Sequence, residues 1–336
     1  MTMRIYRGSI MKALINAALA AVVAAVLTSS AGAQQLKTWR HGIVQAKSDS
    51  GFVFMAANGG FAERYGLKID MVQFTGDALA LKALLAGELD SYEGSPGGPM
   101  LAASQGADLK LLGCYWPTLT YGIYARQSIA TAQDLRGKSM AISAPGALPD
   151  LLARAVLEQN GIPGSEVRFA VMGSDTDRYR AVSVGTVDAA AASTEFVPIA
   201  GTSGVKLLVH AHDVVPNYLR FCTYVAGRTL VQRNADVTAF LAAQISGLRY
   251  AVANREKVIA LALNITQAKA DDPRAAYIFD EVKKYSAIDP EMPIPMDKLT
   301  WMKELLTKTG NLTKPVDLAK LADGGPRERA LELVGK

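Results

Sequence analysis

Two segments of similar design lie in the two halves of this sequence, and they restrict the fold more than any other feature. Residues 74–77 (Phe-Thr-Gly-Asp) lead into a helical run over 79–86, and residues 140–146 (Met-Ala-Ile-Ser-Ala-Pro-Gly) lead into a helix that ends at Asn160. A strand that ends in a glycine-bearing turn before a helix leaves backbone N–H groups pointing into a crevice, where they can hold a small anion or polar ligand. Two such units predict two halves that face each other across a crevice.

The first 33 residues have the composition of an export signal. Arg4, Arg7 and Lys12 precede an apolar stretch over residues 13–27, and the small residues 31–33 (Ala-Gly-Ala) follow it. The apolar stretch is shorter than the ~20 residues that a membrane-spanning helix needs, which favours removal of the segment over an uncleaved membrane anchor. The sequence therefore predicts a cleaved Sec-type signal peptide at residues 1–33 and a periplasmic protein.

The basic character of the whole chain is mostly due to this segment. The chain has 36 Lys and Arg residues and 31 Asp and Glu residues. Because three of the basic residues and none of the acidic ones lie in residues 1–33, the remainder has 33 basic residues against 31 acidic ones, a net charge of +2. A face that binds nucleic acid needs clustered positive charge, so we expect no nucleic-acid partner.

The two cysteines leave two interpretations open. Cys114 and Cys222 both fall in apolar, strand-like runs. Export to an oxidising compartment permits a disulfide between them, and two separate free thiols buried as small hydrophobes are the alternative. Metal binding is not expected, because the sequence has no CxxC pair and no histidine near either cysteine.

Predicted strands and helices alternate along the chain as far as residue 210. The strands are expected at 36–45, 67–74, 89–92, 109–114, 121–125, 139–143, 167–171, 187–191 and 205–210, with helices that include 52–65, 79–86, 99–105, 148–159 and 175–184. A strand over 221–226 has the pattern of a return crossover, and the chain from Asp236 onward is helical. This order predicts an α/β fold with mostly parallel sheets flanked by helices. We expect two lobes, 34–120 with 225–336 and 121–224, joined by two hinge crossovers.

Several motifs resemble those of a known family. They are Phe-Thr-Gly at 74–76, Leu-Lys-Ala-Leu-Leu-Ala-Gly-Glu-Leu-Asp at 81–90, Asp-Leu-Arg-Gly-Lys at 134–138, Ala-Pro-Gly at 144–146 and Gly-Thr-Val-Asp-Ala-Ala at 185–190. Their combination is similar to the periplasmic substrate-binding proteins of ABC importers, in particular to the group that binds aliphatic sulfonates, taurine, nitrate and thiamine pyrimidines. The resemblance implies a two-lobed type 2 periplasmic binding fold with a helical C-terminal segment and ligand capture between the lobes.

The resemblance also implies a function and partners. We expect a monomeric solute-binding protein that delivers a small organic molecule (anionic, zwitterionic or heteroaromatic) to an ABC permease in the inner membrane. Alternatives are a same-fold enzyme of the pyrimidine-precursor type and a ligand sensor or tripartite-transporter receptor. None of His41, His210 and His212 has a Ser, Cys or Asp partner at a suggestive spacing, and no P-loop, dinucleotide or metal motif stands out. The sequence therefore predicts no enzyme, no cofactor and no bound metal.

Ligand contacts are expected in the loops that follow predicted strands. Small and polar residues there let the backbone approach a ligand, and the start of a helix offers free N–H groups. Ordinary turns and helix caps are the alternative interpretation. The candidates of this kind are Ser48, Asp49, Ser50, Thr75, Gly94, Ser95, Pro145, Gly146, Ala147, Asp175 and Thr194.

Five charged or aromatic residues complete the candidate site. Glu93 and Glu195 each follow a predicted strand, where a carboxylate could recognise an N–H-bearing ligand or pair with a nearby lysine or arginine. Tyr115 and Trp116 could stack on a ligand ring or fill the core. Arg178 could bind a ligand carboxylate in bidentate fashion or remain solvated.

Overall fold

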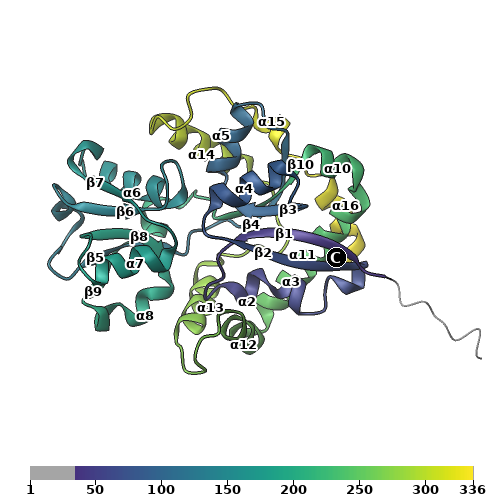
Figure 1. Cartoon of the computed structure of the whole chain (residues 1–336), viewed down its shortest axis with the longest axis horizontal. Coiled ribbons are helices and arrows are strands. Elements are labelled where there is room, and N and C mark those ends of the chain that lie inside the picture. Colours follow the sequence, from purple (N-terminus) through teal and green to yellow (C-terminus); the bar gives the residue numbers. More distant parts are fainter. Residues whose placement is uncertain (1–34, 336) are drawn as a thin grey trace, which may run out of the picture. The chain divides into compact units, whose positions relative to one another are not determined.

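The computed structural model describes residues 35–335, which are built around two five-stranded sheets (Figure 1). The predicted signal peptide at residues 1–33 lies outside the described residues. None of the helices within 35–335 is both long and apolar enough to cross a membrane.

The first sheet has the strand order β2-β1-β3-β10-β4. Its strands are β1 (Lys37–Val44), β2 (Leu67–Phe74), β3 (Ser91–Gly94), β4 (Leu109–Trp116) and β10 (Phe221–Ala226). Strand β1 pairs in parallel with β2 and β3, whereas β10 is antiparallel to β3 and to β4. Only β10 therefore runs against the others, which confirms the predicted mostly parallel sheet.

The second sheet repeats this arrangement with a different part of the chain, in the order β7-β6-β8-β5-β9. Its strands are β5 (Tyr121–Arg126), β6 (Ser139–Ile142), β7 (Arg168–Val171), β8 (Ala189–Ser193) and β9 (Val205–His210). Strand β6 is parallel to β7 and β8, whereas β5 is antiparallel to β8 and β9. Here too a single strand, fourth in the order, is reversed.

The reversed strand in each sheet is the one that receives the chain from the other sheet. The chain leaves β4, passes through residues 117–120 and enters the second sheet as β5; it returns through residues 211–220 and enters the first sheet as β10. The predicted second lobe included residues 221–224, but these residues pair with β3 and β4 of the first sheet.

A disulfide joins β4, from which the first crossover starts, to β10, at which the second crossover ends. Cys114 of β4 and Cys222 of β10 are paired in the antiparallel ladder, and their sulfur atoms are bonded. Of the two interpretations that the sequence left open, the structure has the disulfide. The first-sheet ends of both crossovers are therefore covalently tied to each other.

Helices accompany both sheets (Figure 1). The chain segments of the first sheet contain α2 (Ser50–Val53), α3 (Met55–Asn58), α4 (Asp77–Ala86), α5 (Gly97–Ser104), α10 (Gly227–Gln232), α11 (Asn234–Ala253), α12 (Arg255–Thr266), α13 (Arg274–Tyr285), α14 (Met296–Lys308), α15 (Leu318–Leu321) and α16 (Gly325–Val334). Those of the second sheet contain α6 (Leu148–Gln159), α7 (Asp175–Ser183), α8 (Val197–Ala200) and α9 (Ala211–Val214). The series from α10 to α16 confirms the predicted helical C-terminal segment.

The predicted continuous helix over 52–65 is wrong. This stretch is divided into α2, α3 and a short 3-10 turn at Glu63–Tyr65. Helix α3 ends at Asn58, before Gly59, and Gly60 has a φ of 75°, a left-handed conformation that interrupts a helix and favours glycine. The glycine pair therefore overrides the apolar pattern on either side of it.

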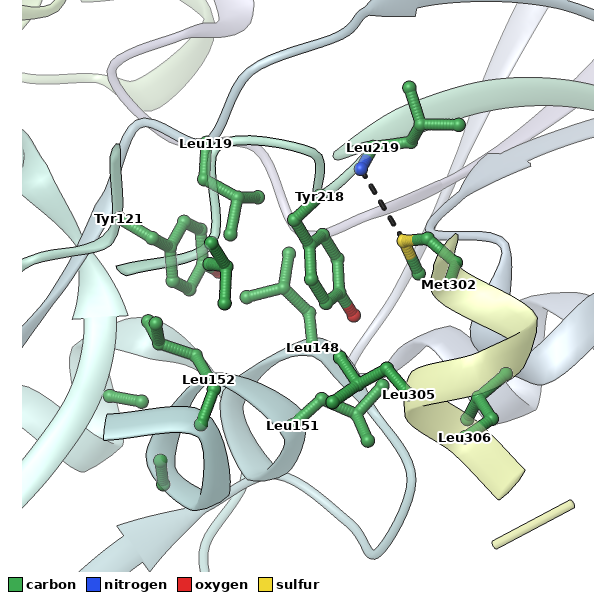
Figure 2. Close-up of a cluster of buried hydrophobic side chains, with 14 of the residues drawn as sticks. Leu119, Tyr121, Leu148, Leu151, Leu152, Tyr218, Leu219, Met302, Leu305 and Leu306 are labelled. Atoms are coloured by element: carbon green, nitrogen blue, oxygen red, sulfur yellow. Dashed lines mark hydrogen bonds between the residues drawn. The ribbon is translucent and has the colours of Figure 1, made fainter. Parts of the chain in front are cut away.

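One apolar core cluster extends from one sheet to the other (Figure 2). Leu151 of α6 and Leu306 of α14 are buried in it, together with Leu119 from the first crossover. Leu219 of the second crossover donates its backbone N–H to the sulfur of Met302 at 3.4 Å. Apolar packing therefore joins the two sheets at the crossovers, in addition to the chain itself.

Candidate functional site

A cavity of about 70 Å³ lies between the two sheets, at the edge where their parallel strands end. Most of its lining comes from the ends of β1, β2 and β3 of the first sheet and of β6 and β7 of the second, or from the loops and helix starts that follow them. Further lining residues come from β5, β10 and the second crossover. The lining residues are Val44, Lys47, Thr75, Gly76, Asp77, Ser95, Tyr121, Ser143, Ala147, Leu148, Pro149, Gly173, Ser174, Asp175, Arg178, Arg220 and Phe221. Open α/β sheets bind ligands at this edge, and a space of this size admits a few water-sized groups.

An ion pair crosses the cavity from one sheet to the other. Lys47, which follows β1, places its Nζ 2.7 Å from Asp175 Oδ2 at the start of α7. The hydroxyl of Tyr121 donates to both carboxylate oxygens at 2.7 Å, and Arg178 donates to one of them. Burial works against the charge on Asp175, but Lys47 and Arg178 outweigh it and lower the pKa of Asp175. Burial likewise opposes the charge on Lys47, and Asp175 raises the pKa of that ammonium.

A second contact crosses beside the first. The backbone N–H of Ser48 donates to Glu195 Oε2 at 2.9 Å, and both residues are buried. Burial raises the pKa of Glu195, although Lys47 and the bond from Ser48 work in the opposite direction. Loops of the two sheets are therefore held together by main-chain and side-chain contacts as well as by the ion pair.

Arg220, in the second crossover, is fully buried and lines the cavity. Its guanidinium donates to the carboxylate of Asp49 and, at 2.6 Å, to Thr120 Oγ1 in the first crossover. It also lies 4.3 Å from the ring centre of Trp116, a cation–π distance. Within residues 35–335 the Nε of Arg220 has no hydrogen-bond partner. Arg220 thus links both crossovers to the loop after β1.

Comparison with known proteins places the chain in a family. The NMT1/THI5-like family model matches residues 47–258, more than half of the chain. The chain belongs to the NMT1/THI5-like family. The matched segment includes every cavity-lining residue except Val44. A comparison with curated proteins finds no matching sequence.

Solved structures share the fold of this NMT1/THI5-like protein at low sequence identity. The alkanesulfonate-binding protein SsuA from Xanthomonas axonopodis pv. citri, bound to MOPS, has a TM-score of 0.72 and 18% identity over 86% of this chain and 99% of that chain. The periplasmic aliphatic sulphonate binding protein SsuA from Escherichia coli has a TM-score of 0.69 and 22% identity over 85% and 97%. The desulfurization enzyme DSZB has a TM-score of 0.66 and 16% identity over 88% and 99%. These matches confirm the predicted two-lobed periplasmic-binding-protein fold.

Five of the residues predicted from the sequence line the cavity of the NMT1/THI5-like protein: Thr75, Ser95, Ala147, Asp175 and Arg178. Arg178 was predicted to bind a ligand carboxylate. In the structure, however, each nitrogen of its guanidinium already donates a hydrogen bond to a protein atom. The acceptors are the carbonyl oxygens of Ala191 and Gly173 and the carboxylate of Asp175. In this structure Arg178 positions Asp175 and the start of α7.

Ser48, Asp49 and Ser50, in the loop after β1, were predicted to contact a ligand, but in the structure they bond to other residues of the protein. Asp49 stands at the N-cap position of α2 but makes no capping bond, since its carboxylate is taken by Arg220. The hydroxyl of Ser50 accepts the N–H of Lys47 at 2.9 Å, and Ser48 meets Glu195 as described. None of these three residues lines the cavity.

Glu93 lies inside the first sheet and does not line the cavity. The Tyr115 hydroxyl donates to its carboxylate, and His41 Nε2 lies 3.4 Å from the same oxygen. Burial and the Glu93 carboxylate raise the pKa of the Tyr115 hydroxyl well above its usual value. Glu93 and Tyr115 therefore satisfy each other's hydrogen-bonding groups. The donor to the Glu93 carboxylate is a tyrosine, not the lysine or arginine that was the expected alternative to a ligand.

Trp116 packs inside the protein as well. Its ring is edge-on to Phe52 and to Phe221, with centroids 5.9 and 5.7 Å apart, and Arg220 covers its face. A ligand ring has no free face of Trp116 to stack on in this structure.

Four further predicted residues also lie outside the lining. Gly94 packs directly against the hydroxyl of Tyr92, so a side chain there would overlap it. The N–H of Gly146, expected to be free, donates to Asp150 Oδ2 at 2.8 Å, and the preceding Pro145 is exposed. Thr194 donates its hydroxyl to Glu281 of α13.

Six polar residues that line the cavity were not among the predicted site residues: Lys47, Asp77, Tyr121, Ser143, Ser174 and Arg220. Lys47 adjoins the predicted Ser48, and Asp77 belongs to the segment 74–77 that also contains the predicted Thr75. The whole loop after each strand, rather than its small residues, was therefore the usable signal. Tyr121 directly follows the first crossover and Arg220 is the last residue of the second, where polar side chains from both sheets meet. Among residues 35–335 no group of three or more metal-ligating side chains is present.

Proposed function

We propose that this NMT1/THI5-like protein is a periplasmic solute-binding protein that captures a small organic molecule in the cavity between its two sheets. The observation that carries the proposal is the position of the cavity, at the strand ends of both sheets, with Lys47 of one loop paired to Asp175 of another across it. A ligand held there contacts both halves at once, so binding is coupled to their closure.

The proposed hinge consists of residues 117–120 and 211–220. The lobes are then those predicted, 34–120 with 225–336 and 121–224, except that residues 221–224 move with the first lobe, to whose sheet they belong. Rotation about the two crossovers opens the cavity to solvent. The narrow cavity corresponds to the closed form, because a volume of about 70 Å³ is too small for a drug-sized ligand. Opening breaks the Lys47–Asp175 and Ser48–Glu195 contacts, and a bound solute replaces part of them.

The proposed partners are the solute and an ABC permease in the inner membrane, with the protein acting as a monomer after removal of a signal peptide. The low-identity structures with the same fold include proteins named as alkanesulfonate-binding and aliphatic sulphonate binding. An anionic organosulfonate is therefore one candidate solute, and zwitterionic or heteroaromatic acids are the others.

A solute screen tests the proposal. Wild-type protein is mixed with transported metabolite classes, and thermal shift and the fluorescence of Trp39, Trp116 and Trp301 are recorded. At least one class should raise the melting temperature, and X-ray scattering should show a smaller radius of gyration with that solute. A protein that responds to no class, or whose scattering profile never changes, contradicts the proposal.

The desulfurization enzyme with the same fold makes an enzymatic role the second candidate. We favour binding because Cys114 and Cys222 are joined to each other and neither lines the cavity, so neither is available as a nucleophile there. Incubation of the protein with each solute that it binds, followed by mass spectrometry, separates the two roles. Recovery of the solute unchanged supports binding, and a product that accumulates over many turnovers supports an enzyme.

A further inference from the structure

One carboxylate that lines the cavity has no cationic partner among the residues that the structure describes. Asp77 opens α4, directly after the turn that follows β2, and its one hydrogen-bond partner within residues 35–335 is the hydroxyl of Tyr92. The other charged groups of the lining are matched, since Lys47 and Arg178 pair with Asp175 and Arg220 pairs with Asp49. Asp77 is thus the unmatched charge of the cavity.

The surroundings of Asp77 do not supply a compensating charge. The ionisable groups around it are Tyr92 of β3, Tyr224 of β10 and Tyr218 of the second crossover. Burial raises the pKa of all three hydroxyls, so they stay neutral near pH 7. Burial also raises the pKa of Asp77 to about 6, which leaves its carboxylate mostly ionised at pH 7 and above.

The fold makes room for this carboxylate. A Cβ on Gly94 would overlap both the Tyr92 hydroxyl and Asp77 Oδ1, and a Cβ on Gly98 would lie 3.4 Å from Asp77 Oδ2. A charge kept in a partly buried site without a counter-ion is costly. A cationic group on a bound solute would remove that cost.

We infer that Asp77 is a specificity-determining residue of the cavity and pairs with a protonated amine, or a similar N–H-bearing cation, of the solute. The inference rests on the proposed function, since it assumes that a solute occupies the cavity. A purely structural role is the competing explanation, because an acidic residue in the first turn of a helix stabilises that helix without any ligand. The two differ in what Asp77 does to the choice of solute.

Matched pairs of solutes that differ only in an amine provide the test: taurine with isethionate, β-alanine with 3-hydroxypropionate, and benzylamine with benzyl alcohol. Affinities are measured by calorimetry for the wild type and for Asp77→Asn. We expect the amine member of a pair to bind about tenfold or more tightly at pH 7.5, and Asp77→Asn to abolish that preference. Asp177→Asn is the matched control, because Asp177 is also an acid in the first turn of a helix, α7, but does not line the cavity.

The pH profile gives a readout that a structural role does not move. Because a cation binds the ionised form of Asp77, wild-type affinity for the amine should rise about tenfold from pH 5 to pH 7.5, with no such rise in Asp77→Asn. Equal binding of both members of every pair that binds, or an unchanged preference in Asp77→Asn, overturns the inference and leaves the proposed function intact. If neither these pairs nor any class of the wider screen binds the wild type, the proposed function fails and the inference fails with it.

Discussion

The two sheets share one strand order but differ in the chemistry of their central strands. Strand β3 of the first sheet carries Glu93, which is buried and accepts a hydrogen bond from Tyr115 of β4. Strand β8, at the same position in the second sheet, has only alanine before Ser193, and the charged residues Asp175 and Arg178, which line the cavity, lie on α7 instead. The same topology therefore places a charged group inside one sheet and at the cavity edge of the other. Topology fixes where a ligand can bind, while side-chain placement decides which charges can reach it.

The largest effect on stability is expected from removing Arg220, the buried arginine that links both crossovers to the loop after β1. Arg220→Met leaves the buried carboxylate of Asp49 without its partner, which should lower the free energy of unfolding by about 3–5 kcal/mol. Urea denaturation followed by circular dichroism measures it. The double variant Arg220→Met with Asp49→Asn should recover part of the loss, and a single-variant loss below ~1 kcal/mol would contradict the role given to Arg220.

The covalent tie on the first sheet has no counterpart in the described part of the second. Replacing both Cys114 and Cys222 by alanine releases a loop of 108 residues in the unfolded chain and should cost about 2–4 kcal/mol. Thermal unfolding with and without dithiothreitol is the measurement. Reductant should destabilise the wild type and leave the double variant unchanged; the same sensitivity in both proteins would argue against the bond.

One buried tyrosine from each sheet allows the two interiors to be compared through the stability lost when its hydroxyl is removed. Tyr115→Phe removes the hydroxyl donor from a buried carboxylate and should cost about 2 kcal/mol, because bonds to charged groups are the stronger ones. Tyr124→Phe removes a 3.0 Å bond to the carbonyl of Ser193 and should cost about 1 kcal/mol. Equal losses in parallel denaturation curves would mean that Glu93 does not distinguish the two interiors.

The smallest effect expected is a pH dependence of the folding stability caused by Asp77, which follows β2 of the first sheet. Because burial raises the pKa of Asp77 to about 6, the folded protein holds a proton there that the unfolded chain gives up near pH 4. The resulting stabilisation is complete below that lower value and is lost as the pH rises through 6. From pH 5 to pH 8 the wild type should therefore lose about 1 kcal/mol more stability than Asp77→Asn. Parallel curves for the two proteins would show that Asp77 titrates normally.

Much of the fold was predictable because its signals are local. Alternating apolar runs bounded by glycine turns predicted strands such as 67–74 and 205–210, which match the bounds of β2 and β9. The same pattern also predicted which edge of the sheets would hold the cavity, because the carboxyl ends of parallel strands lie at one edge. The glycine pair at 59–60 was also visible in the sequence and should have ended the predicted helix there.

The partners of the charged residues were not predictable from one sequence. Arg220 and Asp49 are 171 positions apart, and Ser48 and Glu195 are 147 apart, so no local spacing relates them. Glu93 was expected at the cavity because it follows a strand, but its neighbour Tyr115 becomes apparent only when β4 is placed in the sheet. Residues after strands were the right place to look, and the direction of each side chain depended on contacts far away in the chain.

The bond between Cys114 and Cys222 has a consequence for how the molecule tolerates cleavage. The whole second sheet lies between these two cysteines in the chain. A protease that cut one exposed loop of that region would leave two polypeptides still held by sulfur. Such a nicked molecule would migrate as a single species until a reductant separated its pieces.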